Sequence, residues 1–243
     1  MKLVFCGTPQ FAVPTLKALQ AAGHEIALVV TQPDRPAGRG RQLTAPPVKL
    51  AALAAGFPVT QPERIRNNQE FRARLEAITP EAIAVVAYGR LIPPWMLELP
   101  RLGCINLHAS LLPKYRGAAP IQWAVAMGDA FTGNTTMLLE EGLDTGPILL
   151  QETLAITAEQ TAGICSTCLP SPARRWWSKR WTAWRTEAFS PGRRLPRVSV
   201  SPRCLTAKTG AWTLSRVRRR NSKVAGAVFS PGPALLPRSP AES

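Results

Sequence analysis

The first 31 residues contain a pattern that few folds accommodate. A short apolar run, Lys2–Gly7, ends in a Gly-Thr-Pro turn, and apolar residues then recur at helical spacing to about Ala22. Gly23 ends this helix, and a second apolar run follows at Glu25–Thr31. A strand, a helix and a strand within about 30 residues predict a βαβ unit, and hence a parallel sheet.

Later segments extend the same α/β pattern. We expect a helix at Pro120–Met127 and further strands at Ala82–Tyr88, Gly103–His108, Thr135–Leu139 and Ile148–Ala155. A single Gly follows the first strand, and the G-x-G-x-x-G pattern of dinucleotide sites is absent. The turn at Gly7 is therefore interpreted as a plain strand-to-helix turn.

Charge is distributed unevenly along the chain. The net charge is +15, yet residues 1–163 hold 14 basic and 13 acidic residues, and residues 164–243 hold 16 and 2. Five of the seven Trp also lie in residues 164–243, which we call the tail. The basic character thus belongs to the tail and not to the α/β part.

Several classes of protein are excluded. No apolar run approaches the roughly 20 residues of a membrane span, and the start does not read as a secretory signal. The five Cys show no framework spacing, which favours a reduced, cytoplasmic compartment.

The segment Gln32–Lys49 is rich in Pro, Gly and Arg. With four Pro and two Gly it is predicted to be an exposed loop, neither a helix nor a central strand. Arg35, Arg39 and Arg41 suit contacts with phosphate groups, although a merely solvated loop fits the composition equally well.

Candidate catalytic side chains lie near the end of a predicted strand. Asn106 and His108 are two residues apart, so they share a face of that strand, and strand ends are where parallel sheets bind ligands. Asp144 lies between glycines further on. An Asn, a His and an Asp can supply an oxyanion donor, a general acid or base and an orienting charge.

These segments resemble a known family. FCGTPQFAVPTL, QPDRPAGRGRQL, VVAYGRLIP, INLHASLLPKYRGAAPIQWA and GLDTGPIL are similar, in this order, to motifs of the methionyl-tRNA formyltransferases, over about residues 1–163. The Asn-x-His and the later Asp are shared with the wider folate-dependent formyltransferases. The resemblance implies a Rossmann-like, mostly parallel sheet.

The resemblance also implies roles for individual residues. It implies transfer of a formyl group from 10-formyltetrahydrofolate to the α-amine of methionine on initiator tRNA, with no metal. It implies a catalytic trio of Asn106, His108 and Asp144. It implies a folate-binding set made of Tyr88, Gly89, Ser110, Leu111, Leu112 and Pro113. Arg39 and Arg41 would belong to a loop that enters the acceptor end of the tRNA. One departure is Asn134, where the family usually has an apolar residue in a buried strand position.

The tail does not resemble the family, which continues with the end of the catalytic domain and a basic, β-rich domain. Three interpretations compete: a basic nucleic-acid module, a disordered tail, and translation in a shifted reading frame. Read one base out of register, the codons from Ala227 to Ala234 permit Gly-Phe-Gln-Pro-Trp-Pro-Gly, which is typical of the family. We therefore expect a one-base insertion or deletion near codon 163, and Cys165 and Cys168 are not read as a zinc site.

For function, the resemblance implies a cytoplasmic, monomeric methionyl-tRNA formyltransferase, and we expect the chain, as written, to have weak or no activity on tRNA. Two alternatives stay open at this point. One is a formyltransferase that acts on a small amine, such as a sugar nucleotide or a glycinamide. The other is a non-catalytic RNA-binding protein that uses the Arg- and Trp-rich tail.

Overall fold

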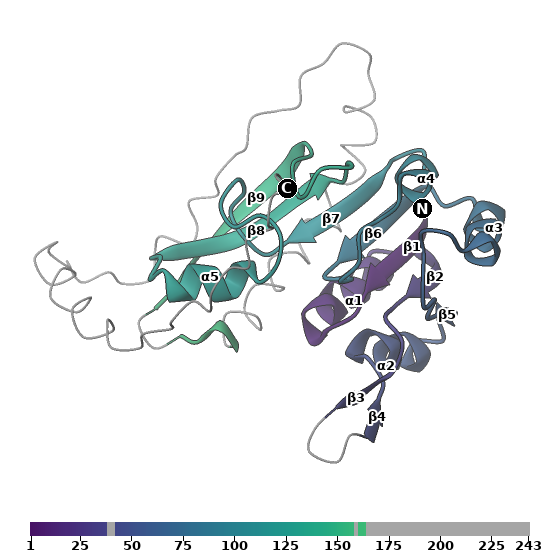
Figure 1. Cartoon of the computed structure of the whole chain (residues 1–243), viewed down its shortest axis with the longest axis horizontal. Helices are drawn as coiled ribbons and strands as arrows, with labels where there is room; N and C mark the ends of the chain where they lie inside the picture. Colours follow the sequence, from purple (N-terminus) through teal and green to yellow (C-terminus); the bar gives the residue numbers. More distant parts are fainter. Residues whose placement is uncertain (38–41, 158–159, 164–243) are drawn as a thin grey trace, which may run out of the picture. The chain divides into compact units, whose positions relative to one another are not determined.

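The computed structural model describes residues 1–37, 42–157 and 160–163 (Figure 1). Its main sheet has seven strands in the order β5-β2-β1-β6-β7-β8-β9. The first five strands in this order are parallel, whereas β8 runs antiparallel to both β7 and β9. The strands are β1 (Lys2–Gly7), β2 (Glu25–Val30), β5 (Val59–Thr60), β6 (Ala82–Val86), β7 (Cys104–His108), β8 (Phe131–Leu138) and β9 (Ile148–Ala155). The predicted α/β class with a mostly parallel sheet is confirmed.

Helices cover both faces of the parallel part of the sheet (Figure 1). One face packs against α1 (Val13–Ala21) and α2 (Pro47–Ala54), and the other against α3 (Gln69–Ile78) and α4 (Pro94–Glu98). A short 3-10 helix, η1 (Gln10–Ala12), precedes α1, and α5 (Pro120–Ala126) lies between β7 and β8 in the chain.

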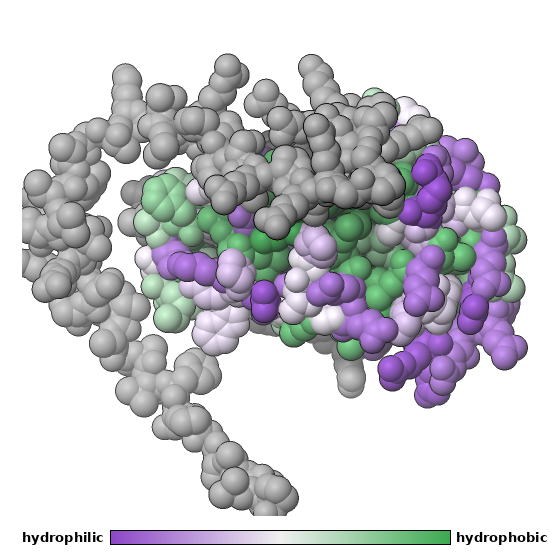
Figure 2. Space-filling model, turned by 90° about the horizontal axis from the view of Figure 1, so that it is seen from above, coloured by the Kyte–Doolittle hydropathy of each residue, from purple (hydrophilic) through white to green (hydrophobic). Residues whose placement is uncertain are grey.

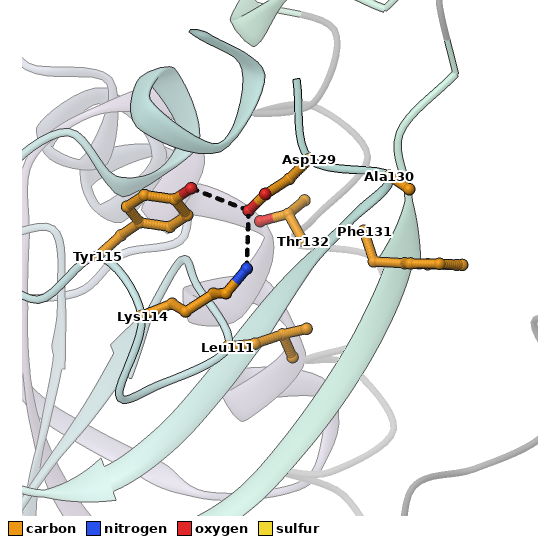
Figure 3. Close-up of a pocket in the computed structure, with 7 residues that line it drawn as sticks. All are labelled: Leu111, Lys114, Tyr115, Asp129, Ala130, Phe131 and Thr132. Atoms are coloured by element: carbon orange, nitrogen blue, oxygen red, sulfur yellow. Dashed lines mark hydrogen bonds and ion pairs between the residues drawn. The ribbon is translucent and has the colours of Figure 1, made fainter. Parts of the chain in front are cut away.

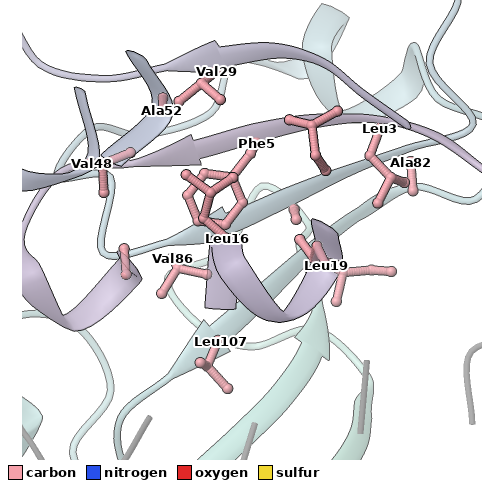
Figure 4. Close-up of a cluster of buried hydrophobic side chains, with 14 of the residues drawn as sticks. Leu3, Phe5, Leu16, Leu19, Val29, Val48, Ala52, Ala82, Val86 and Leu107 are labelled. Carbon is pink, nitrogen blue, oxygen red and sulfur yellow. The ribbon is translucent and has the colours of Figure 1, made fainter. Parts of the chain in front are cut away.

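The burial of strand β1 on both of its faces explains why its sequence is an unbroken apolar run. Leu3 and Phe5 belong to the hydrophobic cluster on the α1 face (Figure 4), whereas Val4 and Cys6 belong to the cluster on the α3 face. All four side chains are fully buried. A strand buried on both faces has no polar alternation, which is the pattern of parallel sheets between helices.

Helix α3 was not predicted, although its start has a clear signal. The side chain of Asn68 accepts a hydrogen bond from the backbone N–H of Phe71 at 2.9 Å, which is an N-cap. Phe71 and Leu75, one turn apart, are the buried residues of the helix. Hydrophilic side chains gather at the end of the described surface where α3 lies (Figure 2), which fits a helix with a narrow apolar stripe.

The segment Gln32–Lys49 is only partly a loop, so that prediction needs correction. It contains a hairpin of β3 (Arg35–Ala37) and β4 (Gln42–Thr44), which form a two-stranded sheet of their own. Its last three residues begin α2, because Pro at the first helical position lacks an N–H that the helix would leave unpaired anyway.

Most other predicted bounds agree to within one or two residues. Strand β6 ends at Val86 and not at Tyr88, because Ala87 has a φ of 46°, outside the extended region. Strand β8 begins at Phe131, four residues before the predicted start. Asn134 is buried in β8, directly opposite Glu152 of β9, so the position is a buried one as expected.

Within the described ranges, no helix is both long and apolar enough to span a bilayer. The predictions for the tail, including Cys165, Cys168 and the Trp cluster, lie outside the described residues, as do Arg39 and Arg41.

Candidate active site

The end of strand β7 carries two of the predicted catalytic side chains. Asn106 and His108 are two residues apart on the strand, so both project from the same face. Asp144 reaches them from the loop between β8 and β9, where its backbone adopts a positive φ of 49°. Asp tolerates this left-handed conformation better than most residues. The structure thus brings together three residues that lie up to 38 positions apart.

The carboxylate of Asp144 is the centre of this trio. Asn106 Nδ2 donates to Asp144 Oδ1 at 3.4 Å, and His108 Nδ1 lies 3.5 Å from Asp144 Oδ2. The backbone N–H of Gly117 donates to the same Oδ2 at 2.8 Å. The side chains of His108 and Asp144 are 7% and 11% exposed, so their attraction is screened little by water.

The two ring nitrogens of His108 both face acceptors. Nδ1 faces the Asp144 carboxylate, and Nε2 lies 2.8 Å from the backbone oxygen of Tyr115. A neutral imidazole has one N–H, whereas the imidazolium has two and can satisfy both partners. The geometry therefore accommodates two N–H donors on the ring.

Two contributors to this cluster were not foreseen from the sequence. Tyr115 and Gly117 act through backbone atoms, which no side-chain pattern announces. Both have positive φ, 54° and 81°, in the loop that follows β7. The one available signal was Gly117, since glycine is the residue that most readily adopts this conformation.

The segment Ser110–Pro113 begins two residues after His108, which ends strand β7. The side chains of Ser110 and Leu112 are buried, and Ser110 Oγ donates to the backbone oxygen of Lys114 at 2.6 Å. Leu111 is half-buried and Pro113 is exposed. What this segment offers a ligand is therefore the apolar surface of Leu111 and Pro113.

Tyr88 and Gly89 follow strand β6 at the same edge of the sheet. The ring of Tyr88 is buried in the cluster on the α3 face, and this burial raises the pKa of its phenol. Its backbone oxygen accepts from Thr8 Oγ1 at 3.0 Å and from Gln32 Nε2 at 3.2 Å. The side chain of Tyr88 is therefore not available to a ligand at the strand ends.

The hairpin is fixed at its base by a carboxylate. Lys49 Nζ donates to Asp34 Oδ2 at 2.6 Å, and Gln61 Nε2 donates to Asp34 Oδ1 at 2.7 Å. These two hydrogen bonds lower the pKa of Asp34. Arg35, the next residue, is exposed at the start of β3.

A separate cavity of about 330 Å³ lies beside the segment after β7 (Figure 3). Asp129 holds one side of it, where Tyr115 Oη donates at 2.9 Å and Lys114 Nζ lies 3.4 Å away. Burial and the Asp129 carboxylate raise the pKa of Tyr115. None of the trio lines this cavity; its lining residues are Leu111, Lys114, Tyr115, Asp129, Ala130, Phe131 and Thr132.

Among the residues that the structure describes, no three His, Cys, Asp or Glu side chains are grouped so that they could hold a metal ion. The two described cysteines, Cys6 and Cys104, are free and buried.

The formyl transferase family model matches residues 1–175, and the chain belongs to this family. A solved phosphoribosylglycinamide formyltransferase from Bacillus halodurans shares the fold, with a TM-score of 0.63 and 23% identity over 77% of this chain and 97% of that one.

Within the family, the chain is similar to enzymes named methionyl-tRNA formyltransferase. It is 73% identical over 162 residues to that of Acidobacterium capsulatum and 66% identical over 162 residues to that of Koribacter versatilis. Each alignment covers 67% of this chain and 52% of the relative. The chain therefore spans about half the length of the curated relatives it matches.

Proposed function

We propose that residues 1–163 are the catalytic part of a methionyl-tRNA formyltransferase, which transfers a formyl group from 10-formyltetrahydrofolate to the methionyl α-amine of initiator tRNA. The observation that carries this proposal is the contact of Asn106 and His108 with Asp144 at the end of β7. The 73% identity to the Acidobacterium capsulatum enzyme supports the choice of acceptor.

The folate supplies the formyl carbon when it is bound. Attack by a neutral amine forms a bond from its nitrogen to that carbon and develops negative charge on the formyl oxygen. Asn106 has a second N–H that can donate to this oxygen, and the charged ring of His108 lies beside it. Asp144 stabilises the imidazolium and accepts, through water, the proton that the amine loses. That proton ends on the nitrogen from which the formyl group departs, so the reaction balances.

The residues around the trio fit a folate. Leu111 and Pro113, three and five residues after His108, present apolar surface, and Tyr88 and Gly89 follow β6 at the same edge of the sheet. Flat aromatic rings are held by such apolar contacts with a few fixed polar groups. We assign the folate to this edge, with Ser110, Leu111, Leu112, Pro113, Tyr88 and Gly89 around it.

The tRNA contacts are assigned to the β3–β4 hairpin. Arg35 is exposed there, and Arg39 and Arg41 belong to the same segment. Arginine side chains bind phosphates, and each phosphate contact adds to the salt dependence of binding. The proposal places the enzyme in the cytoplasm as a monomer that binds initiator tRNA.

The tail is assigned to a shifted reading frame that begins near codon 163. Sequencing of the genomic DNA across codons 155–175 tests this assignment, because an uninterrupted frame there would contradict it. We expect the chain as written to formylate tRNA weakly or not at all, and wild-type-like rates from it would refute that expectation.

A chain with the frame restored tests the function itself. We expect it to transfer labelled formyl from 10-formyltetrahydrofolate to initiator Met-tRNA, and we expect His108→Ala and Asp144→Asn to lower the rate at least about 100-fold. Lys17→Ala, on the exposed face of α1, is the control and should leave the rate unchanged. Formylation of a glycinamide or an amino sugar nucleotide without tRNA would favour the small-amine alternative instead.

A further inference from the structure

The residues His108, Thr135 and Gln151 form one row across three strands. Thr135 of β8 lies directly opposite His108 of β7, and Gln151 of β9 lies directly opposite Thr135. Residues opposite one another in antiparallel strands project from the same face of the sheet. Gln151 is therefore two strands away from the catalytic histidine but on its face.

This row holds the backbone of the segment that follows His108. Thr135 Oγ1 donates to the backbone oxygen of Ser110 at 2.6 Å and accepts from the backbone N–H of Leu112 at 3.1 Å. Gln151 Nε2 donates to the backbone oxygen of Leu112 at 2.7 Å and to Thr135 Oγ1 at 3.0 Å. Two side chains from two strands thus fix three backbone groups of one turn.

The chemistry of these contacts requires a side chain with two N–H donors at position 151. The hydroxyl of Thr135 gives its only proton to Ser110, so it can act toward its other partners only as an acceptor. The backbone oxygen of Leu112 is an acceptor too. A side chain that serves both must offer two N–H donors from one atom, which the NH₂ group of Gln151 does.

We propose that Gln151 is a positioning residue for formyl-donor binding, acting through Thr135 and Leu112 on the Ser110–Pro113 segment and on His108. This inference rests on the proposed function, because it assigns the folate to that segment. Without the two donors, the segment adopts its binding conformation for only part of the time. The apparent affinity then falls in proportion to that fraction.

Binding of 5-formyltetrahydrofolate, a stable relative of the formyl donor, to the purified full-length chain is the first readout. We expect Gln151→Met, which keeps the length of the side chain and removes both donors, to weaken binding at least about tenfold, since that is the effect of a competent fraction near one tenth. Asn68→Ala is the matched control. Its amide also bonds two backbone groups, at Arg64 and Phe71, but on α3, away from the site. It should lower the thermal midpoint and leave the affinity within about twofold.

The histidine NMR signals are a second readout that does not need folate. The chain has two histidines, and His24 precedes β2 at the opposite end of the parallel strands from His108. We expect Gln151→Met to shift the ring signal of His108 and to leave that of His24 in place. A general loss of stability would not select one histidine.

Gln151→Glu decides the question if Gln151→Met does not fold, because glutamate has nearly the same shape and its ionised form has no donors. Unchanged affinity and an unchanged His108 signal in the folded variant overturn the proposal, as does an equal loss of affinity in Asn68→Ala. If the parent chain does not bind 5-formyltetrahydrofolate, the proposed function fails, and the positioning of His108 by Gln151 is judged on the NMR signal alone.

Discussion

The backbone N–H of Gly117 donates to Asp144 Oδ2 at 2.8 Å, which ties the loop after β7 to the loop between β8 and β9. The same oxygen faces His108 Nδ1 at 3.5 Å. Gly117 therefore helps to hold the carboxylate in the direction of the imidazole, although it contributes no side chain.

Replacement of Gly117 by alanine should disturb this contact. The residue has a φ of 81°, and an added Cβ would lie 3.1 Å from Leu143 Cδ2. We expect a loss of about 1–2 kcal/mol in urea unfolding and a shift of the His108 NMR signal. Gly128→Ala is the control, because Gly128 also has a positive φ, of 67°, but an added Cβ there has no heavy atom within 4 Å. An unmoved His108 signal in Gly117→Ala would show that the contact does not matter to the ring.

Gly7 is required by close packing and not by its backbone conformation. A Cβ at this position would lie 2.8 Å from Phe5 Cε1 and 3.0 Å from the backbone oxygen of Val86. The carbonyl belongs to strand β6 and cannot move away without disturbing the sheet. We expect Gly7→Ala to lower the free energy of unfolding by about 1–3 kcal/mol, as overpacking does. Equal stability of the two proteins in urea would contradict this account.

Acid should weaken the anchor of the hairpin. Lys49 and Gln61 lower the pKa of Asp34, so the folded state binds a proton there less readily than the unfolded state. The stabilisation is therefore fully present above about pH 4 and is lost as the pH falls through the lowered pKa. We expect Asp34→Asn to lose less stability than the parent between pH 5 and pH 3, by thermal melting. Glu98→Gln, an exposed change on α4, should follow the parent curve.

The two described cysteines should resist alkylation. Burial raises the pKa of Cys104 to about 12, and burial together with the nearby Cys104 thiol raises the pKa of Cys6 well above its usual value. A raised pKa lowers the thiolate fraction at neutral pH, and the thiolate is the reactive form. Iodoacetamide labelling read by peptide mass spectrometry should modify both residues only after denaturation. Labelling of Cys104 in the native protein at the rate of a free thiol would disagree with its burial.

The first βαβ unit could be predicted closely because its signals are local. Glycines bound the helix, and strands buried on both faces read as apolar runs, as in β1 and β2. Helix α2 was hidden because its first residues are part of a Pro-rich segment, and Pro is compatible with both a loop and a first helical turn. The hairpin was missed because each of its strands has only three residues, and all three residues of β4 are exposed, so neither strand has an apolar pattern.

The candidate site shows where local reasoning ends. Asn106 and His108 share a face because side chains alternate along a strand, and their spacing in the sequence is enough to predict this. The approach of Asp144 depends on the return of the chain through β8, and the roles of Tyr115 and Gly117 depend on backbone atoms. Gln151 had no sequence signal, because its partners at Leu112 and Thr135 are fixed only by the register of three strands.

The hairpin β3–β4 forms a small sheet of its own, and its base is held by the hydrogen bonds of Asp34 with Lys49 and Gln61. A change in its length therefore does not alter the register of the seven strands that carry Asn106 and His108. Under the proposed function, acceptor recognition by the hairpin and formyl transfer at the end of β7 are therefore separate modules. A different hairpin between Asp34 and Lys49 would then change the acceptor without a change in the sheet.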